Sequence, residues 1–289
     1  MKKYIEMIRA KHYIKNLLIF VPAFFGRKIF DKSLIFTNII GFLSFCMIAS
    51  SIYIVNDLKD IQKDRNHYEK KKRPIASGQI SKQIAICWLI ALLTISIALL
   101  LFCQEKNAWK SIMWILLYLT INVLYSFGLK NIPIVDVMIL AAGFVIRVLY
   151  GAALDDINVS SWLYLTVWSI SLYMGLGKRR NEIIQQKNAE TRMVLKFYSD
   201  KYLNNMMHIS MSLTIVFYSL WSANVSNYSN ITPQMIWTLP LILAIVMRYE
   251  MVIESSSSSG DPVKVLLSDK ALLMMSFIYI LFVMSVIYI

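Results

Sequence analysis

An acidic stretch at the end of an apolar segment has the residue types and the spacing to bind a divalent cation. In "NDLKDIQKD" four oxygen-bearing side chains occur close together: Asn56, Asp57, Asp60 and Asp64. If the apolar segment continues as a helix, the three aspartates share one face. Such hard oxygen ligands suit Mg²⁺, which binds one or two carboxylates together with waters and substrate phosphates. The alternative is a solvated helix end, neutralised by its neighbours Lys59, Lys63 and Arg65.

A basic run follows this acidic stretch. In "EKKKRPIASGQIS" the cations are Lys70, Lys71, Lys72 and Arg73. Cations beside a carboxylate-bound metal can hold further phosphate oxygens, so the two motifs together suit a diphosphate that departs during a reaction. The lysines could instead contact anionic lipids at a membrane surface. That alternative is weaker for Arg73, which stands directly before Pro74.

The composition indicates that a membrane protein carries these motifs. The chain is 57% hydrophobic with a mean hydropathy of +0.56, which is typical of a polytopic all-α membrane protein. We expect a single integral-membrane domain, 1–289, with nine transmembrane helices. The predicted helices are 14–30, 33–55, 83–103, 109–127, 133–153, 161–177, 206–224, 233–251 and 271–289. Pro22 should kink the first of them.

The distribution of Lys and Arg predicts the orientation of the helices. When residues near the helix ends are counted with the adjoining loops, 24 of the 30 Lys and Arg residues fall at the start of the chain and in the loops after the even-numbered helices, against 5 in the other loops. The positive-inside rule then places the N-terminus in the cytoplasm and the C-terminus outside. The net charge of +13 therefore reflects topology and not nucleic-acid binding. The long basic loops, with the chemistry they carry, are expected on the cytoplasmic face.

The two motifs together resemble a known family signature. "NDLKDIQKDRNHYEKKKRPIASGQIS" is similar to the first motif of the UbiA-type prenyltransferase superfamily. The segment 125–151, "YSFGLKNIPIVDVMILAAGFVIRVLYG", resembles the branch that uses phosphoribosyl diphosphate, the decaprenyl-phosphate phosphoribosyltransferases. The resemblance implies a UbiA-type helical bundle in a prokaryotic inner (plasma) membrane.

A second motif departs from the aromatic prenyltransferases of this superfamily. These carry a second Asp-rich motif where this chain has "GLGKRRNE", with Lys178, Arg179 and Arg180 and only Glu182 acidic. Three cations in place of metal-binding carboxylates suggest a second anionic group in the pocket. A phosphoribosyl diphosphate donor and a polyprenyl phosphate acceptor would each bring one.

The resemblance implies a reaction and a set of site residues. The expected reaction is Mg²⁺-dependent transfer of a 5-phosphoribosyl group from phosphoribosyl diphosphate to a polyprenyl (decaprenyl-type) phosphate, with release of diphosphate, as in cell wall biosynthesis. The implied Mg²⁺ ligands are Asn56, Asp57, Asp60 and Asp64, of which the aspartates are catalytic. The implied substrate-binding residues are Lys15, Asn16, Arg73, Tyr125, Lys130, Lys178 and Arg179.

Two other functions stay open at this point. One is a UbiA-type prenyltransferase that moves an isoprenyl group from a prenyl diphosphate to an aromatic acceptor. The other is a membrane transporter or lipid-binding protein without chemistry, although transporters more often place polar sites near the middle of the membrane. A homo-oligomer is possible. The roles of four further charged residues also stay open: Asp136, Arg147, Asp261 and Asp269.

Overall fold

A computed structural model describes residues 2–66, 70–103, 108–185, 193–228, 233–255 and 262–288. These residues form α- and 3-10 helices joined by short connections, and no strand occurs among them, so the predicted all-α class is confirmed. The chain divides into two compact units, Met1–Lys130 with Ile146–Asn158 and Asn131–Val145 with Val159–Ile289. The single domain 1–289 stays a prediction.

The first unit contains most of the N-terminal half of the chain. Its elements are α1 (Lys2–Ile8), η1 (Ala10–Phe20), α2 (Val21–Phe25), α3 (Lys32–Lys59), α4 (Ile61–Asn66), η2 (Lys70–Lys72), α5 (Lys82–Cys103), α6 (Ala108–Phe127) and η3 (Leu129–Asn131). The helix α7 (Val135–Leu154) contributes residues to both units.

The second unit contains the C-terminal half. Its further elements are α8 (Ser161–Gln185), η4 (Met193–Phe197), α9 (Asp200–Tyr228), η5 (Pro233–Thr238), α10 (Leu239–Ser255), α11 (Pro262–Ser268) and α12 (Lys270–Tyr288).

In the described part of the chain, seven helical segments are long and apolar enough to cross a membrane. They lie in α3, α5, α6, α7, α9, Gln234–Glu254 and α12. The predicted number of nine is not confirmed. The first predicted span, 14–30, is a 3-10 helix followed by the short α2, which begins at Val21 with Pro22 in its first turn. The sixth lies in α8, where Ser, Tyr, Trp and Gly residues lower the hydropathy.

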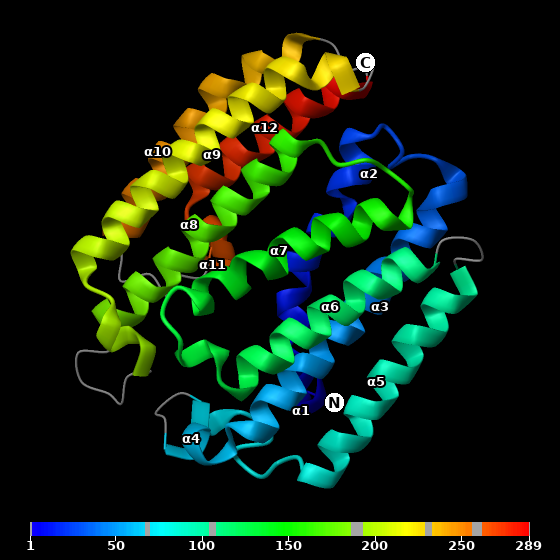
Figure 1. Cartoon of the computed structure of the whole chain (residues 1–289), viewed down its shortest axis with the longest axis vertical. Coiled ribbons are helices and arrows are strands. Elements are labelled where there is room, and N and C mark those ends of the chain that lie inside the picture. Colours follow the sequence, from blue (N-terminus) through cyan, green and yellow to red (C-terminus); the bar gives the residue numbers. More distant parts are fainter. Residues whose placement is uncertain are drawn as a thin grey trace. The chain divides into compact units, whose positions relative to one another are not determined.

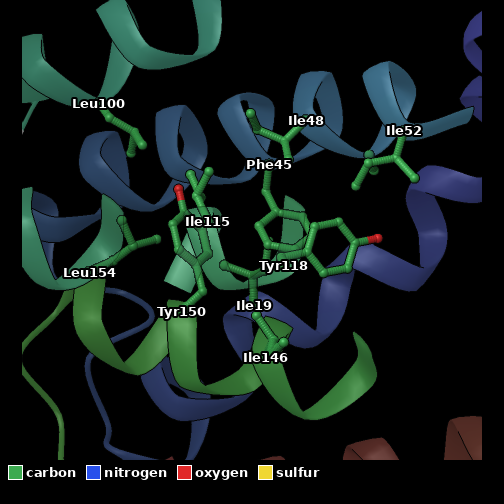
Figure 2. Packing of buried hydrophobic residues seen from close by; sticks show 11 residues of the cluster. Ile19, Phe45, Ile48, Ile52, Leu100, Ile115, Tyr118, Ile146, Tyr150 and Leu154 are labelled. Carbon is green, nitrogen blue, oxygen red and sulfur yellow. The ribbon is translucent and has the colours of Figure 1, made fainter. Parts of the chain in front are cut away.

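The core of the first unit forms where α3 packs against α5, α6 and η1 (Figure 1). Figure 2 shows its centre, where the ring of Phe45 lies 4.7 Å from that of Tyr118 and 5.1 Å from that of Tyr150. Aromatic pairs at such distances stabilise a core beyond the area they bury. The Tyr150 hydroxyl donates to the carbonyl oxygen of Gly41 over 2.9 Å, which satisfies a polar group that would otherwise be costly to bury.

Small residues allow close helix packing in this unit. A Cβ atom on Gly151 would lie 1.9 Å from the carbonyl oxygen of Ile19, so only glycine lets α7 approach η1 this closely. Between α3 and α5, Ser44 and Ser96 each donate to the other's carbonyl oxygen over 3.1 Å. Small residues and interhelical hydrogen bonds are typical of helix contacts within membranes.

The core of the second unit lies along the contact between α8 and α9 (Figure 1). Tyr173 and Leu176 of α8 pack with Leu203 and Met207 of α9. Side chains three and four residues apart lie on one helical face, so each helix presents a continuous apolar stripe to its neighbour. Val137, in the first turns of α7, joins this cluster.

Candidate active site

Arg73 connects two of the three aspartates of the acidic motif. Its Nη1 atom donates to Asp57 Oδ1 over 2.9 Å and to Asp64 Oδ2 over 2.7 Å. The helix does not run on through the motif as one piece: α3 ends at Lys59, with Asp60 as its C-cap, and α4 begins at Ile61. Asp57 and Asp64 are both buried. Their shared cation offsets the repulsion between two carboxylates that lie this close.

Arg9 is a second arginine at Asp57. Its Nη2 atom donates to the same oxygen, Asp57 Oδ1, over 2.5 Å, and its guanidinium carbon lies 4.5 Å from the centre of the Tyr53 ring. Arg9 has a φ of 53°, in the left-handed region, which costs a non-glycine residue energy and is enriched at functional sites. Burial lowers the pKa of the Arg9 guanidinium, and the Asp57 carboxylate only partly offsets that shift; an arginine nevertheless keeps its charge in proteins.

The last turn of α6 and the following η3 contain the partners of the remaining motif residues. Lys130 Nζ donates to Asp60 Oδ2 over 2.6 Å, and Ser126 Oγ donates to Asn56 Oδ1 over 3.3 Å. The structure thus places Lys130, a predicted substrate-binding residue, at Asp60 of the acidic motif. Its role in substrate binding stays a prediction.

Two of the three neighbouring cations expected of a merely solvated helix end have other contacts. Lys59 Nζ lies 3.8 Å from the centre of the Phe127 ring, and Arg65 Nε donates to the carbonyl oxygen of Ala76 over 3.0 Å. The ion pairs of the aspartates instead come from Arg9, Arg73 and Lys130. Residues far apart in sequence therefore build this site.

The oxygen donors at this site suit Mg²⁺ in type, since they are carboxylates and one side-chain amide. Their arrangement is that of ion pairs: within the described ranges, no three His, Cys, Asp or Glu side chains converge as the ligands of one metal ion. Three carboxylates face three cations, so their formal charges cancel. The assignment of Asn56, Asp57, Asp60 and Asp64 as metal ligands stays a prediction.

Asn16 and Arg147 lie together in the core of the first unit. Arg147 Nε donates to Asn16 Oδ1 over 2.8 Å, and Arg147 Nη2 donates to the Tyr118 hydroxyl over 2.8 Å. Arg147 also lies 5.3 Å from the centre of the Phe45 ring. An arginine in a membrane-spanning helix must find such partners to be tolerated. Asn16 is buried in this network, whereas Lys15 is partly exposed.

A second polar cluster lies in the second unit and contains Arg179. Arg179 Nε donates to Asp136 Oδ2 over 2.5 Å, and its Nη1 atom donates to Glu182 Oε2 over 2.9 Å. The Tyr198 hydroxyl donates to Asp136 Oδ1 over 2.6 Å and accepts from the backbone nitrogen of Ile134 over 2.6 Å. Burial, together with the hydrogen bond to Asp136, holds the pKa of Tyr198 well above its usual range.

The three cations of "GLGKRRNE", the basic motif of α8, are therefore not equivalent. Arg179 is fully buried and ion-paired, Lys178 is exposed, and Arg180 is half-buried. The guanidinium of Arg179 has two carboxylate partners and no exposed surface, and its role in substrate binding stays a prediction. Lys178 and Arg180 are thus the more exposed cations of this motif, and Arg179 ties α8 to the first turn of α7.

The structure assigns a structural contact to one more residue whose role was open. Asp269 caps the N-terminus of α12, where its Oδ1 atom accepts from the backbone nitrogen of Leu272 over 2.7 Å, and it pairs with Arg248 Nη2 over 2.7 Å. These bonds hold the pKa of the Asp269 carboxyl below its usual range. Tyr125 is half-buried, and Asp261 lies outside the described residues.

The apolar helices that carry this cation-paired acidic motif define a multi-pass membrane protein. Comparison with known proteins gives its family. Residues 19–268 match the UbiA prenyltransferase family. The chain therefore belongs to this family of multi-pass membrane transferases, as the resemblance of its motifs indicated.

Relatives and solved structures agree with this assignment. The chain is 31% identical to a decaprenyl-phosphate phosphoribosyltransferase of Corynebacterium glutamicum, over 99% of this chain and 86% of that protein. It is 29% identical to the enzyme of the same name from Mycolicibacterium smegmatis, over 93% of this chain and 87% of that protein. A UbiA homologue from Archaeoglobus fulgidus bound to GPP and Mg²⁺ has the same fold, with a TM-score of 0.74 at 21% identity over 99% of this chain and 100% of that one.

Proposed function

We propose that this protein transfers a 5-phosphoribosyl group from phosphoribosyl diphosphate to a polyprenyl phosphate in the membrane and releases diphosphate. The observation that carries the proposal is the cluster in which Asp57, Asp60 and Asp64 are each paired with a cation. It occurs in a chain similar over nearly its whole length to decaprenyl-phosphate phosphoribosyltransferases. Carboxylates and cations side by side suit a metal-bound diphosphate.

Asn56, Asp57, Asp60 and Asp64 are the residues that would hold Mg²⁺. The ion supplies Lewis-acid stabilisation of the negative charge that develops on the departing diphosphate. Arg73 and Lys130, which already contact these aspartates, add hydrogen-bond donors for phosphate oxygens, and donors aimed at developing charge lower the barrier further.

In the proposed reaction, an oxygen of the lipid phosphate forms a bond to C1 of the ribosyl group while the bond from C1 to the diphosphate oxygen breaks. The bonding electrons leave with the diphosphate. Because the acceptor phosphate is already ionised at neutral pH, the step needs no strong general base.

The proposed location is a prokaryotic plasma membrane, with the N-terminus and the acidic motif on the cytoplasmic side. The excess of Lys and Arg at the start of the chain and in alternate loops supports this orientation. A soluble donor such as phosphoribosyl diphosphate would then reach the acidic motif from the cytoplasm.

The test supplies membranes containing the protein with radiolabelled phosphoribosyl diphosphate and polyprenyl phosphate, with Mg²⁺ or with a chelator. We expect labelled lipid only with Mg²⁺, and none from Asp60→Asn or Asp64→Asn. The matched control is Asp156→Asn, an exposed aspartate whose partner is Lys110 and whose loss should leave transfer unchanged. Absence of labelled lipid, together with transfer from a prenyl diphosphate to an aromatic acceptor, would favour the isoprenyl-transfer function instead.

A further inference from the structure

We propose that Arg9 and Arg73 occupy the metal-binding carboxylates before the donor arrives, so that Mg²⁺ enters this site together with the diphosphate and not ahead of it. In this role Arg9 is a donor-binding residue that the acidic and basic motifs do not include. The inference rests on the proposed function, because it concerns the order in which the ligands of that site bind.

The first argument comes from the contacts of the aspartates. Asp57 Oδ1 accepts from both Arg9 Nη2 and Arg73 Nη1, over 2.5 and 2.9 Å. Asp64 Oδ2 accepts from the same Arg73 nitrogen over 2.7 Å. Each carboxylate that would bind the metal therefore has an oxygen already taken by a cation, which accounts for the lack of convergent metal ligands in the described part of the chain.

The second argument comes from the charges of the cluster. Three carboxylates and three cations form a formally neutral cluster, so a divalent ion arriving alone would meet guanidinium groups that cannot lose their protons. A diphosphate brings several negative charges and many acceptor oxygens. The arginines can exchange their carboxylate partners for phosphate oxygens, which frees the carboxylates for the metal. Metal and diphosphate binding are then coupled, and each raises the affinity for the other by the same factor.

The third argument comes from the conformation of Arg9. Its guanidinium stacks over the Tyr53 ring, so it keeps a favourable cation–π contact while its hydrogen-bond partner changes. The Tyr53 ring is itself held edge-on by His12, with ring centroids 5.4 Å apart. The left-handed backbone of Arg9 is a strained conformation, and such strain persists where the surrounding structure holds a side chain for a function.

The test measures Mn²⁺ binding to the purified full-length protein by electron paramagnetic resonance, with and without inorganic diphosphate. For the native protein we expect diphosphate to raise the Mn²⁺ affinity about tenfold or more. Arg9→Gln and Arg73→Gln should each raise the affinity for Mn²⁺ alone and reduce the gain from diphosphate. The control is Arg27→Gln, because Arg27 is exposed and also left-handed but belongs to no part of this cluster.

Three results would overturn the inference: equal Mn²⁺ affinity with and without diphosphate, no Mn²⁺ binding even with diphosphate, or no change in either cluster variant relative to Arg27→Gln. None of these measurements requires transfer to occur. If labelled lipid forms while Mn²⁺ binds alone at full affinity, the ordered entry is wrong and the proposed function stands. If Mn²⁺ and diphosphate are coupled but no ribosyl lipid forms, the role of the arginines stands and the proposed donor is wrong.

Discussion

Arg179 donates from Nε to Asp136 Oδ2 over 2.5 Å, and both side chains are fully buried. Arg179 lies in the basic motif of α8, and Asp136 lies in the first turn of α7. This ion pair ties the part of α8 that carries Lys178 to a second helix, and Tyr198 adds a hydrogen bond from the segment before α9. The motif thus contains one structural cation beside the accessible ones.

Asp136→Asn should strongly destabilise the protein. The substitution leaves a buried guanidinium without its main counter-charge, and breaking a buried pair in this way costs about 3 kcal/mol or more. Thermal unfolding in detergent measures the effect, with Asp156→Asn, from the exposed pair with Lys110, as the control that should melt like the native protein. Equal melting temperatures for the two variants would show that the buried pair contributes no more than a surface one.

Arg73→Lys should reduce ribosyl transfer about tenfold or more while the protein still folds. One guanidinium nitrogen of Arg73 reaches both Asp57 and Asp64, and an ammonium on a shorter, flexible stem cannot reproduce that planar geometry. The transfer assay and a melting curve measure the two effects separately. Arg27→Lys, the same exchange at an exposed arginine outside this cluster, is the control and should retain full activity. Native-like transfer by Arg73→Lys would mean that only the charge matters.

Gly151→Ala should destabilise the first unit, whereas Gly128→Ala should not. The new Cβ would lie 1.9 Å from the Ile19 carbonyl oxygen, while nothing lies within 4 Å of a Cβ at Gly128. Overpacking of this kind typically costs about 1–3 kcal/mol. Melting temperatures of the two single variants provide the comparison, and a neutral Gly151→Ala would show that η1 moves away from α7 at little cost.

The stability contribution of Asp155 should fall as pH rises. Burial raises the pKa of this carboxyl above its usual range, and the hydrogen bonds from Asn38 only partly oppose the shift. Because the folded-state pKa exceeds the unfolded value of about 3.9, the contribution is complete below the unfolded pKa and is lost as pH rises through the folded one. The melting temperature of the native protein minus that of Asp155→Asn should therefore decrease from about pH 4 upward.

Asp31 provides a control of opposite sign. Hydrogen bonds from Ser33 hold the pKa of its carboxyl below the usual range. Its contribution is therefore present above the unfolded pKa and is lost as pH falls through the folded one. The melting temperature of the native protein minus that of Asp31→Asn should therefore increase with pH. The same direction for both aspartates would contradict the assignment of burial as the cause at Asp155.

Much of the fold and one part of the site follow from the sequence. The hydropathy predicts the all-α class, and the spacing of "NDLKDIQKD" with the nearby Arg-Pro pair predicts the family and places Arg73 by the aspartates. These are local signals, since the contacting residues lie within 16 positions of one another. The number of spans is less accessible to sequence analysis, because Pro22 and the 3-10 segment η1 interrupt the first predicted helix.

The remaining part of the site depends on tertiary contacts. Arg9 is 48 residues from Asp57 in sequence, and nothing in its neighbourhood distinguishes it from a cation that only orients the first segment. Arg179 did carry a signal. It follows Tyr173 and Leu176 at intervals of three residues, and all three are buried, so helical periodicity places Arg179 on the packed face of α8 and Lys178 off it.

The reciprocal serine contact between α3 and α5 has a consequence for how the acidic motif is carried. The segment between these helices contains Asp60, Asp64 and Arg73, and both of its ends continue into helices joined at Ser44 and Ser96. The motif is therefore carried on one helical hairpin, whose two helices are joined by these hydrogen bonds about four turns away from the loop. A graft that exchanged this loop between relatives would need to match the hairpin and the motif's outside partners Arg9, Ser126 and Lys130.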